Sequence, residues 1–453
     1  MLNETASTRE DRPIVRVALP PVSNAELLHN ELRQMVATVM AVENENFAEP
    51  SQHEEAQPAA PGLSLESHLV ASFEGRLLTD SEAAYQKLDD ELVKINHLAV
   101  FRETQNQNTA SLTTQNPHTI HILTGRVNPA PRAWWPNALL FVLTLFSVLI
   151  VGWDLALQAL ALDNPAEAAR VAERGLLEIW RGLPFALSIM LILGAHEMGH
   201  YITARRHKLA VTLPYFIPLP FISALGTMGA FIQLRQPMRN RKMLFDVGAS
   251  GPLVGLVFAI PILLIGLANL HPEPITGTGT YEGDSLIYAA AKTITYGHFV
   301  PDGRVDICIN CNQLAWAGWM GLLVTSLNLI PIGQLDGGHV LYSLIGERAR
   351  KLYYPMLITI GALGVFASNL WLFWVVLMLF FGRIYATPLD MITPLDGRRR
   401  GLAVFTLIVF VLVFIPAPLS QQLVAPPRTG PVDSAYLFPI VGLLLSRLTR
   451  LKT

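Results

Sequence analysis

Long apolar segments fill the chain from residue 133 onward and determine the solvent in which it folds. Segments of spanning length alternate there with short polar joints, and a helix needs about 20 apolar residues to cross the ~30 Å core of a bilayer. Of the 453 residues, 51% are hydrophobic and only 15% are charged, against roughly 25% charged residues in an ordinary soluble domain. The sequence therefore predicts a polytopic α-helical membrane protein.

We expect about eight transmembrane helices. The apolar stretch 352–381 is longer than one straight span of ~20 residues needs, so it is read as two short helices joined at Ser368 and Asn369. This hairpin also places all clusters of basic residues on one side of the membrane, as the positive-inside rule requires. The expected spans are 134–160, 183–204, 247–270, 314–332, two within 352–381, 401–415 and 436–448, and the last of these either crosses the bilayer or lies in its interface.

The basic clusters also predict the orientation. With Arg205 to Lys208 and Arg239 to Lys242 on the cytoplasmic side, both termini are cytoplasmic and the loop 271–312 lies outside. We expect an integral multi-pass protein of the cell membrane. The net charge of -2 gives no basic field that would attract nucleic acid, so no nucleic-acid partner is expected.

Residues 1–132 are predicted to be a cytoplasmic region, followed by a multi-pass membrane domain over 133–453. A small α+β domain is expected near 65–125, because strand-like segments flank a helix that Asp80 would cap. Upstream of it, the pattern predicts a strand at 14–19, a helix at 24–42 and a linker at 44–62. His118 and His121 lie on a predicted strand without an acidic or cysteine companion, so they are assigned no metal chemistry.

The second predicted span carries an HExxH motif, His196-Glu197-Met198-Gly199-His200. On a helix, residues four apart share one face, so both histidines can reach one zinc ion while Glu197 lies next to it. Each ionisable side chain costs a few kcal/mol within the bilayer unless it is paired or bound to metal. Metal binding accounts for all three. His196 precedes Arg205 by nine residues, so the metal would lie roughly 10 to 15 Å below the cytoplasmic surface.

A catalytic zinc site also needs a third protein ligand and an open position for water. The segment from Asn328 to His339 supplies a candidate in Asp336, because Pro331 and three glycines interrupt the helix around it. The alternative interpretation is an aspartate that caps a helix at a turn. His339 is expected to have a structural role beside the site rather than to bind the metal.

These two motifs resemble those of the site-2 protease family of intramembrane zinc metalloproteases. The resemblance covers about residues 180–345 and is closest to the bacterial and chloroplast branch. It implies one Zn²⁺ ion held by His196, His200 and Asp336, with Glu197 as the catalytic base. It further implies that Asn328 helps to hold the substrate or the oxyanion.

The chain departs from the family in two places. The family's common Asn-Pro-Asp-Gly reads Gln334-Leu335-Asp336-Gly337 here, so the ligand is kept but its turn differs. The outer loop 271–312 is too short for the PDZ domain of some relatives, since a domain usually needs 50 residues or more. No gating by a PDZ domain is therefore expected.

The implied activity is hydrolysis of peptide bonds in or beside the transmembrane segments of substrate proteins, as in regulated intramembrane proteolysis. Such an enzyme must unwind a helical substrate and offer its backbone new partners. Prolines 214, 218 and 220 forbid one long helix over 211–234, so a membrane-embedded loop or β-hairpin is expected there. It either pairs with the extended substrate by strand addition or only seals the cavity.

Two other function classes fit parts of the sequence. A transporter or channel would use the buried His, Glu and Asp as an ion path, but it predicts ionisable residues spread along a pathway. A noncatalytic membrane scaffold would bind partners through 1–132 and tolerate the loss of Glu197, which is present. Cys308 and Cys311, in the outer loop, form a disulfide or remain as two idle thiols, since a redox couple or half a zinc site is less favoured.

Overall fold

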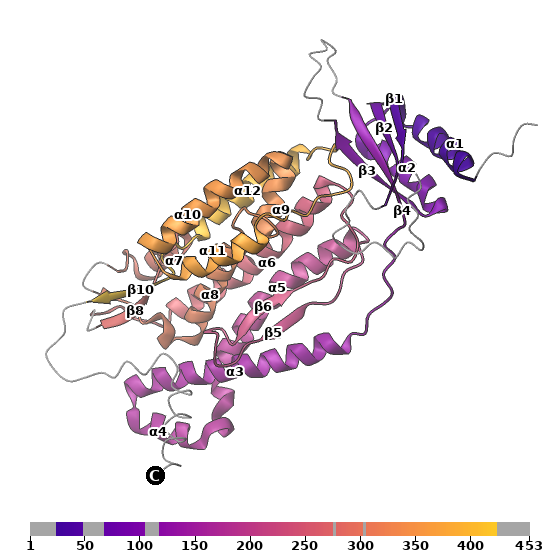
Figure 1. Ribbon diagram of the computed structural model, residues 1–453. Helices are drawn as coiled ribbons and strands as arrows, with labels where there is room; N and C mark the ends of the chain where they lie inside the picture. Colours follow the sequence, from indigo (N-terminus) through magenta and orange to yellow (C-terminus); the bar gives the residue numbers. More distant parts are fainter. Residues whose placement is uncertain (1–23, 49–67, 105–116, 275–277, 302–304, 424–453) are drawn as a thin grey trace, which may run out of the picture.

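The computed structural model describes residues 24–48, 68–104, 117–274, 278–301 and 305–423. An α+β domain lies at one end of an elongated helical domain, and the short strands β8 (Thr278–Glu282) and β10 (Leu419–Leu423) lie at the other end (Figure 1). The predicted strand at 14–19 and the predicted last span at 436–448 lie outside the described residues.

The N-terminal domain is a two-layer sandwich of one sheet and two helices. Its antiparallel sheet has the strand order β1-β2-β4-β3, and both helices pack on the same face through one apolar core. Asp80 caps the second helix as predicted, since its Oδ1 accepts a hydrogen bond from the backbone N–H of Ala83 at 3.0 Å. The elements are α1 (Asn24–Ala37), β1 (Met40–Phe47), β2 (Leu69–Leu77), α2 (Ser81–Leu92), β3 (His97–Glu103) and β4 (His118–Thr124).

One predicted boundary in this domain is wrong. The helix expected over 24–42 ends at Ala37, and Met40–Phe47 forms the edge strand β1 in place of the helix end and the linker. An edge strand has one neighbour, and most side chains of β1 are exposed and polar, including Asn44 and Glu45. The alternation of apolar and polar residues that identifies a strand is therefore largely missing.

The helical domain follows the predicted order of apolar segments. The long stretch 352–381 is divided into two helices, and the Trp371 N–H bonds to the Ser368 carbonyl in the turn between them, which confirms the predicted hairpin. The helices are α3 (Trp135–Asp163), α4 (Pro165–Arg174), α5 (Leu183–Arg206), α6 (Arg241–Leu267), α7 (Leu286–Tyr296), α8 (Gln313–Asn328), α9 (Asp336–Ile345), α10 (Tyr353–Phe366), α11 (Leu370–Phe381) and α12 (Gly397–Val413).

Three helical stretches among the described residues are long and apolar enough to cross a membrane. They are Trp135–Asp163, Pro165–Arg206 and Arg241–Leu267. The second stretch joins α4, a 3-10 helix (Gly175–Gly182) and α5. These stretches make the protein a membrane protein, and the remaining apolar helices are shorter than this criterion requires.

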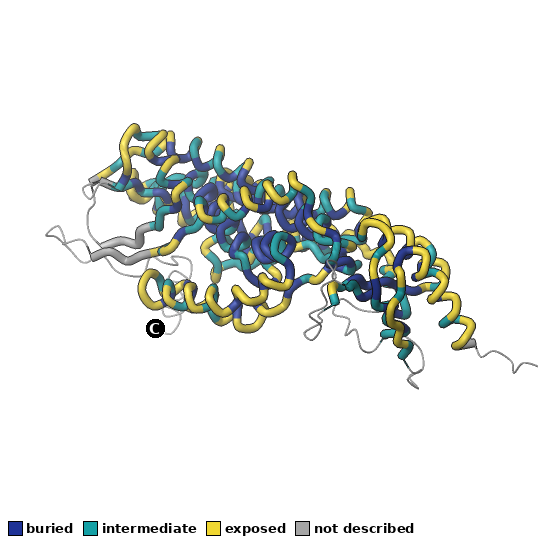
Figure 2. The backbone as a smooth tube through the Cα atoms, turned by 90° about the horizontal axis from the view of Figure 1, so that it is seen from above, coloured by how far each residue is buried: buried dark blue, intermediate teal, exposed yellow. Residues whose placement is uncertain are grey.

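Helices α5, α6 and α8 form the centre of the helical domain. Their facing residues belong to one large apolar core, and Figure 2 shows buried backbone in the middle of the domain with exposed residues along the outer helices. Exposed apolar side chains on these outer helices include Phe141 and Phe405, as expected where lipid replaces water around a bundle.

The two domains are joined by an extension of the N-terminal sheet. The backbone N–H of Phe101 on β3 donates to the Leu389 carbonyl at 2.8 Å, and the Met391 N–H donates to the Phe101 carbonyl at 3.2 Å. The segment from Leu389 to Met391 lies between α11 and α12, so the helical domain adds a short parallel bridge to the free edge of the sheet. The guanidinium of Arg102 donates to the carbonyls of Pro388 and Leu389, at 3.1 and 2.8 Å.

Cys308 and Cys311 form a disulfide beside the start of α8. Of the alternatives left open by the sequence, the structure therefore shows the disulfide. This end of the bundle lies opposite the N-terminal domain. One end of the helical domain therefore carries a disulfide, and the other contacts the α+β domain.

Replacing Arg102 by alanine should loosen the junction between the domains. Hydrogen bonds to a charged group contribute about 1.5–3 kcal/mol each, so we expect amide hydrogen exchange at Leu389 and Met391 to become roughly tenfold faster or more. Arg33→Ala, which removes an exposed ion pair with Glu45 near the other edge of the sheet, is the matched control and should leave these amides unchanged. Equal exchange in wild type and Arg102→Ala would show that Arg102 does not hold this segment.

Candidate metal centre

Helix α5 carries the HExxH motif into the buried centre of the helical domain. His196, Glu197 and His200 are all buried, although they lie within a helix that is otherwise almost wholly apolar until Arg205. The four-residue spacing places both histidines on one face, and their Nε2 atoms are 3.2 Å apart.

Asp336 reaches this pair from the first turn of α9. Its Oδ2 lies 3.3 Å from the Nε2 of His196 and 3.3 Å from the Nε2 of His200. The segment before α9 is not helical, and Gly333 has a φ of +57°, a conformation that glycine adopts without steric penalty. The aspartate is therefore directed at the two histidines, and the alternative of a helix-capping role does not describe this geometry.

These three side chains form the only group of three or more potential metal ligands found in the described part of the chain. One ligand atom from each of His196, His200 and Asp336 lies within 4.8 Å of the others. Two imidazole nitrogens and one carboxylate oxygen are donors that suit a divalent transition metal, and a set of three protein ligands leaves a coordination position open.

A backbone carbonyl fixes the orientation of one ligand. The Nδ1 of His200 donates a hydrogen bond to the carbonyl of Val247 on α6 at 2.7 Å. With the proton on Nδ1, the lone pair of Nε2 is free to face a metal ion. The same bond holds α5 against α6 at the depth of the site.

Small residues on α6 make this close approach possible. A Cβ atom at Gly251 would lie 2.1 Å from the Nε2 of His200, and a Cβ at Gly255 would lie 3.3 Å from the Cβ of His196. A Cβ at Gly248 would lie 2.7 Å from the Cβ of His339. Only glycine at 251 leaves room for the ligand nitrogen. Helix α6 therefore shapes the site mainly through the absence of side chains at its glycines.

A β-hairpin lies beside Glu197. Strands β5 (Tyr215–Pro218) and β6 (Thr227–Phe231) pair antiparallel in the segment 211–234, as one of the two forms expected there. Strand β6 packs against α5, and the carboxylate of Glu197 lies near the backbone of Ile232, directly after β6. Its Oε1 lies 4.0 Å from the Nε2 of His196, so the carboxylate is held next to the ligand cluster without joining it.

Asn328 and His339 border the cluster in different ways. Asn328 ends α8, and its Nδ2 lies 3.3 Å from the Nε2 of His196. His339 is on α9, one turn after Asp336, and packs against α6 near Gly248. Asn328 thus reaches the ligand cluster, whereas His339 is not among the converging donors.

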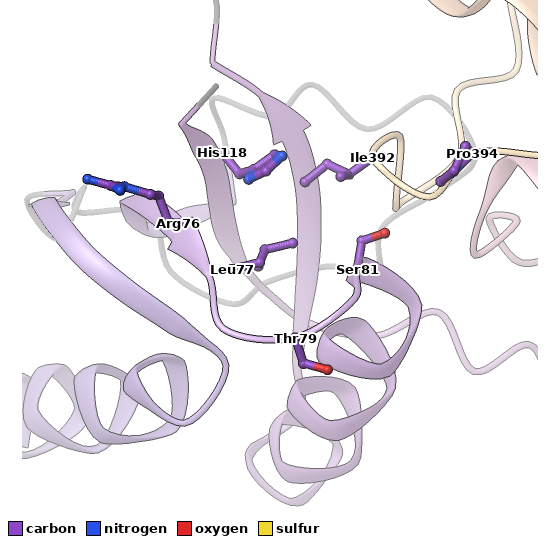
Figure 3. A pocket seen from close by; sticks show the side chains of 7 residues that line it. All are labelled: Arg76, Leu77, Thr79, Ser81, His118, Ile392 and Pro394. Atoms are coloured by element: carbon purple, nitrogen blue, oxygen red, sulfur yellow. The ribbon is translucent and has the colours of Figure 1, made fainter. Parts of the chain in front are cut away.

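The histidines of the N-terminal domain lie far from this cluster in the fold. His121 Nδ1 is 3.0 Å from the Ser72 hydroxyl. His118 lines a pocket of about 410 Å³ between the sheet and the loop before α12, together with Arg76, Ser81 and Pro394 (Figure 3). Among the described residues, no second histidine, cysteine or carboxylate lines this pocket. Burial lowers the pKa of His118.

Sequence reasoning missed a polar network at the end of α5. Asp246 on α6 lies 2.9 Å from the Nε2 of His207 and accepts two hydrogen bonds from Arg399 at 2.7 and 2.8 Å. In the sequence, this network is indicated by Asp246, a single acidic residue at the start of an apolar segment. The residue after Asp246 is Val247, whose carbonyl accepts the bond from His200.

A second buried charged group lies near the opposite end of the bundle. Lys292 on α7 is buried and pairs with Asp284 at 2.6 Å, while the hydroxyl of Tyr288 donates to Glu282 at 2.8 Å. Burial raises the pKa of Glu282 to about 7. The group fastens α7 to the loop before it, and it contains no converging set of metal ligands.

Comparison with known proteins shows what this part of the chain resembles. Peptidase family M50 matches residues 184–372, which include every member of the ligand cluster. The chain is 30% identical over 245 residues to probable zinc metalloprotease EGY2, chloroplastic, of Arabidopsis thaliana, covering 53% of this chain and 42% of the relative.

Other relatives give the same result. The chain is 28% identical over 306 residues to probable zinc metalloprotease EGY1, chloroplastic, of Oryza sativa subsp. japonica, covering 64% of this chain and 52% of the relative. It therefore spans about half the length of these curated relatives. No solved structure matches the chain. Residues 184–372, which hold the cluster, are thus similar to peptidase family M50.

Proposed function

We propose that this protein is an intramembrane zinc metalloendopeptidase. It would hydrolyse peptide bonds in or beside the transmembrane segments of its substrates, as in regulated intramembrane proteolysis. The observation that carries the proposal is the convergence of His196, His200 and Asp336 beside Glu197, within a helical stretch apolar enough to span a membrane. The relatives named zinc metalloproteases support the same chemistry.

The ligand cluster fits a single zinc ion. Nε2 of His196, Nε2 of His200 and the carboxylate of Asp336 would hold the ion, which matches the three-ligand pattern of catalytic zinc sites. When bound, zinc makes a water molecule nucleophilic near neutral pH and polarises the scissile carbonyl. The Val247 carbonyl supports this arrangement by fixing the proton of His200 on Nδ1.

Glu197 is proposed as the general base. Its carboxylate takes the proton of the attacking water and later delivers it to the leaving amine. The burial of Glu197 excludes bulk water that would compete for the proton.

Asn328 is proposed to stabilise the oxyanion or hold the substrate. Its amide Nδ2 lies on the same side of the cluster as His196 and is a hydrogen-bond donor that carries no charge. A donor placed where negative charge develops on the substrate carbonyl lowers the barrier of the reaction.

We further propose how the protein sits in its membrane. Residues 1–132 and both termini would be cytoplasmic, and residues 133–453 would form the protease with its core at 180–345. Arg205 and Arg206 end α5 at the same end of the bundle as the N-terminal domain, and the disulfide of Cys308 lies at the other end. Basic residues inside and a disulfide outside support this orientation, with about eight spans in a cell membrane.

Strand addition is the proposed mode of substrate binding. In the sheet of β5 and β6, β5 packs against α3, while β6 packs against α5, the helix that carries Glu197. An extended substrate paired along β6 would place its backbone beside the catalytic carboxylate. Substrates would be membrane proteins with a transmembrane segment.

The transporter and scaffold alternatives are less well supported. His196, Glu197, His200 and Asp336 gather at one place instead of lining a path through the bundle. A scaffold has no use for a carboxylate held beside a metal-binding cluster. Neither alternative is favoured by a specific contact.

Glu197→Gln should abolish cleavage and leave metal binding intact. Removal of a general base reduces the rate by about 10²–10⁴-fold, while the three ligands remain. The measurement is zinc content by atomic absorption, together with cleavage of a model transmembrane peptide by the purified protein. Glu173→Gln, an exposed carboxylate on α4, is the control. Bound zinc with equal cleavage by wild type and Glu197→Gln would contradict the role of Glu197.

Asn328→Ala should lower kcat about 10²–10³-fold, the usual effect of losing one oxyanion donor, with little change in KM. Steady-state cleavage of the same peptide measures both constants. Asn269→Ala, at the exposed end of α6, is the matched amide control. A rise in KM at constant kcat would assign Asn328 to substrate binding instead.

Met228→Cys tests strand addition. Met228 is an exposed residue of β6, so a cysteine there should form a disulfide with a cysteine placed near the scissile bond of the substrate. Leu187→Cys, on the exposed face of α5, should not. Cross-linking is measured on nonreducing gels with the Glu197→Gln protein. Equal cross-linking at both positions would leave only the cavity-sealing role for the hairpin.

A further inference from the structure

A basic pocket lies where the N-terminal domain meets the helical domain. Its volume is about 380 Å³, and it lies around the end of α5 and the starts of α6 and α12, with α2 of the N-terminal domain on one side. We call it the interdomain basic pocket, and six basic side chains line it: Arg206, His207, Lys208, Arg239, Lys242 and Arg399.

Half of these basic side chains already have acidic partners. Lys242 Nζ pairs with Glu82 of α2 at 2.7 Å. His207 and Arg399 share Asp246, at 2.9 and 2.7 Å. These pairs hold the wall of the pocket together, and the Glu82 pair links the two domains across it.

The other three basic side chains have no acidic partner among the described residues. Among the residues that the structure describes, Arg206, Lys208 and Arg239 form no ion pair and no side-chain hydrogen bond. Three unpaired cations around one concave site repel each other. An anion in the pocket would remove that repulsion.

The backbone holds one of these cations in a conformation that lysine rarely adopts. Lys208 has a φ of +59°, in the left-handed region that costs a side-chain-bearing residue roughly 1–2 kcal/mol. The N–H of Lys208 donates to the Arg205 carbonyl, and the Leu209 N–H donates to the Ala204 carbonyl. The turn that ends α5 therefore fixes Lys208 at the rim of the pocket.

The N-terminus of α6 does not by itself account for anion binding in the pocket. Asn240 caps this helix, with its Oδ1 accepting a hydrogen bond from the Met243 N–H at 3.0 Å. One of the free N–H groups of the first turn is thus already satisfied. The attraction for an anion comes from the basic side chains.

An exposed apolar stripe leads along α5 to the pocket. Leu187, Leu191, Met198 and Ile202 are exposed, and their spacing of four or seven places them on one face of the helix. The next position on that face is Arg206. A molecule with an apolar chain on this stripe would place a polar head at the pocket.

We propose that the interdomain basic pocket binds a phosphate group, carried by a phospholipid headgroup or present as a free phosphate ion. Guanidinium groups pair with phosphate oxygens through two parallel hydrogen bonds, and lysine adds a point charge. The apolar stripe favours the phospholipid. A phosphate there would connect the end of the HExxH helix, α6 and the N-terminal domain, and the proposal does not depend on proteolytic activity.

The test compares two triple variants of the full chain. The pocket variant is Arg206→Gln, Lys208→Asn and Arg239→Gln, with asparagine at 208 because it tolerates the left-handed conformation. The matched control, which loses the same charge, is Arg348→Gln, Arg398→Gln and Arg400→Gln, all exposed residues. Size-exclusion chromatography and circular dichroism check folding. If the triple pocket variant does not fold, Lys208→Asn and Arg239→Gln are measured singly.

Two probes separate the sources of phosphate. Protein from nanodiscs of phosphatidylcholine with added phosphatidylglycerol is analysed by native mass spectrometry for retained phosphatidylglycerol. Protein in uncharged detergent is titrated with inorganic phosphate against sodium chloride of equal ionic strength, and the unfolding temperature is followed. We expect the pocket variant to bind on the order of a hundredfold more weakly than wild type, about fivefold for each charge removed.

Each result of the two assays either supports or overturns phosphate binding in the pocket. Loss of retained phosphatidylglycerol in the pocket variant alone supports the proposal with a phospholipid as the source. A phosphate-dependent rise in the unfolding temperature of wild type and control, absent from the pocket variant, supports it with free phosphate as the source. Equal behaviour of the two triple variants in both assays overturns it, because general surface charge would then explain any binding.

Discussion

The placement of four ionisable side chains inside an apolar helix bundle is the constraint on which the rest of the structure depends. Each of His196, Glu197, His200 and Asp336 would cost several kcal/mol if it were buried alone. Their convergence removes most of this cost, because the carboxylate of Asp336 faces both imidazoles at 3.3 Å. The packing of α5 against α6, the broken segment before α9 and the position of β6 all serve this one cluster.

The parts of the site that follow from local spacing could be predicted from the sequence. His196 and His200 follow from a helical repeat, and Asp336 stands out because glycines and Pro331 surround it in an apolar segment. The hairpin of α10 and α11 was predictable from length and charge. The bond from His200 to the Val247 carbonyl could not be predicted, because the sequence does not show which backbone carbonyl a side chain contacts.

Contacts between distant segments escaped prediction for a related reason. The strand β1 is polar, and its identity comes from pairing with β2 rather than from its own pattern. The bridge from Phe101 to Leu389 joins residues 288 positions apart through main-chain atoms. It gives the N-terminal domain a fixed place on the loop that leads into α12, whose Arg399 bonds to Asp246. The edge of the sheet is thus connected to the end of α5 by a short series of contacts, through the loop, Arg399 and Asp246.

Gly251 shows how far a metal site extends beyond its ligands. The ligand nitrogen of His200 occupies the position where a side chain at 251 would begin. A protein with alanine at this position would keep the complete HExxH motif and its distant aspartate, and a motif search would accept it as intact. Its helices would nevertheless be forced apart at the depth of the site. Capacity to bind metal in such a fold should therefore be judged on the helix that supplies no ligand as well as on those that do.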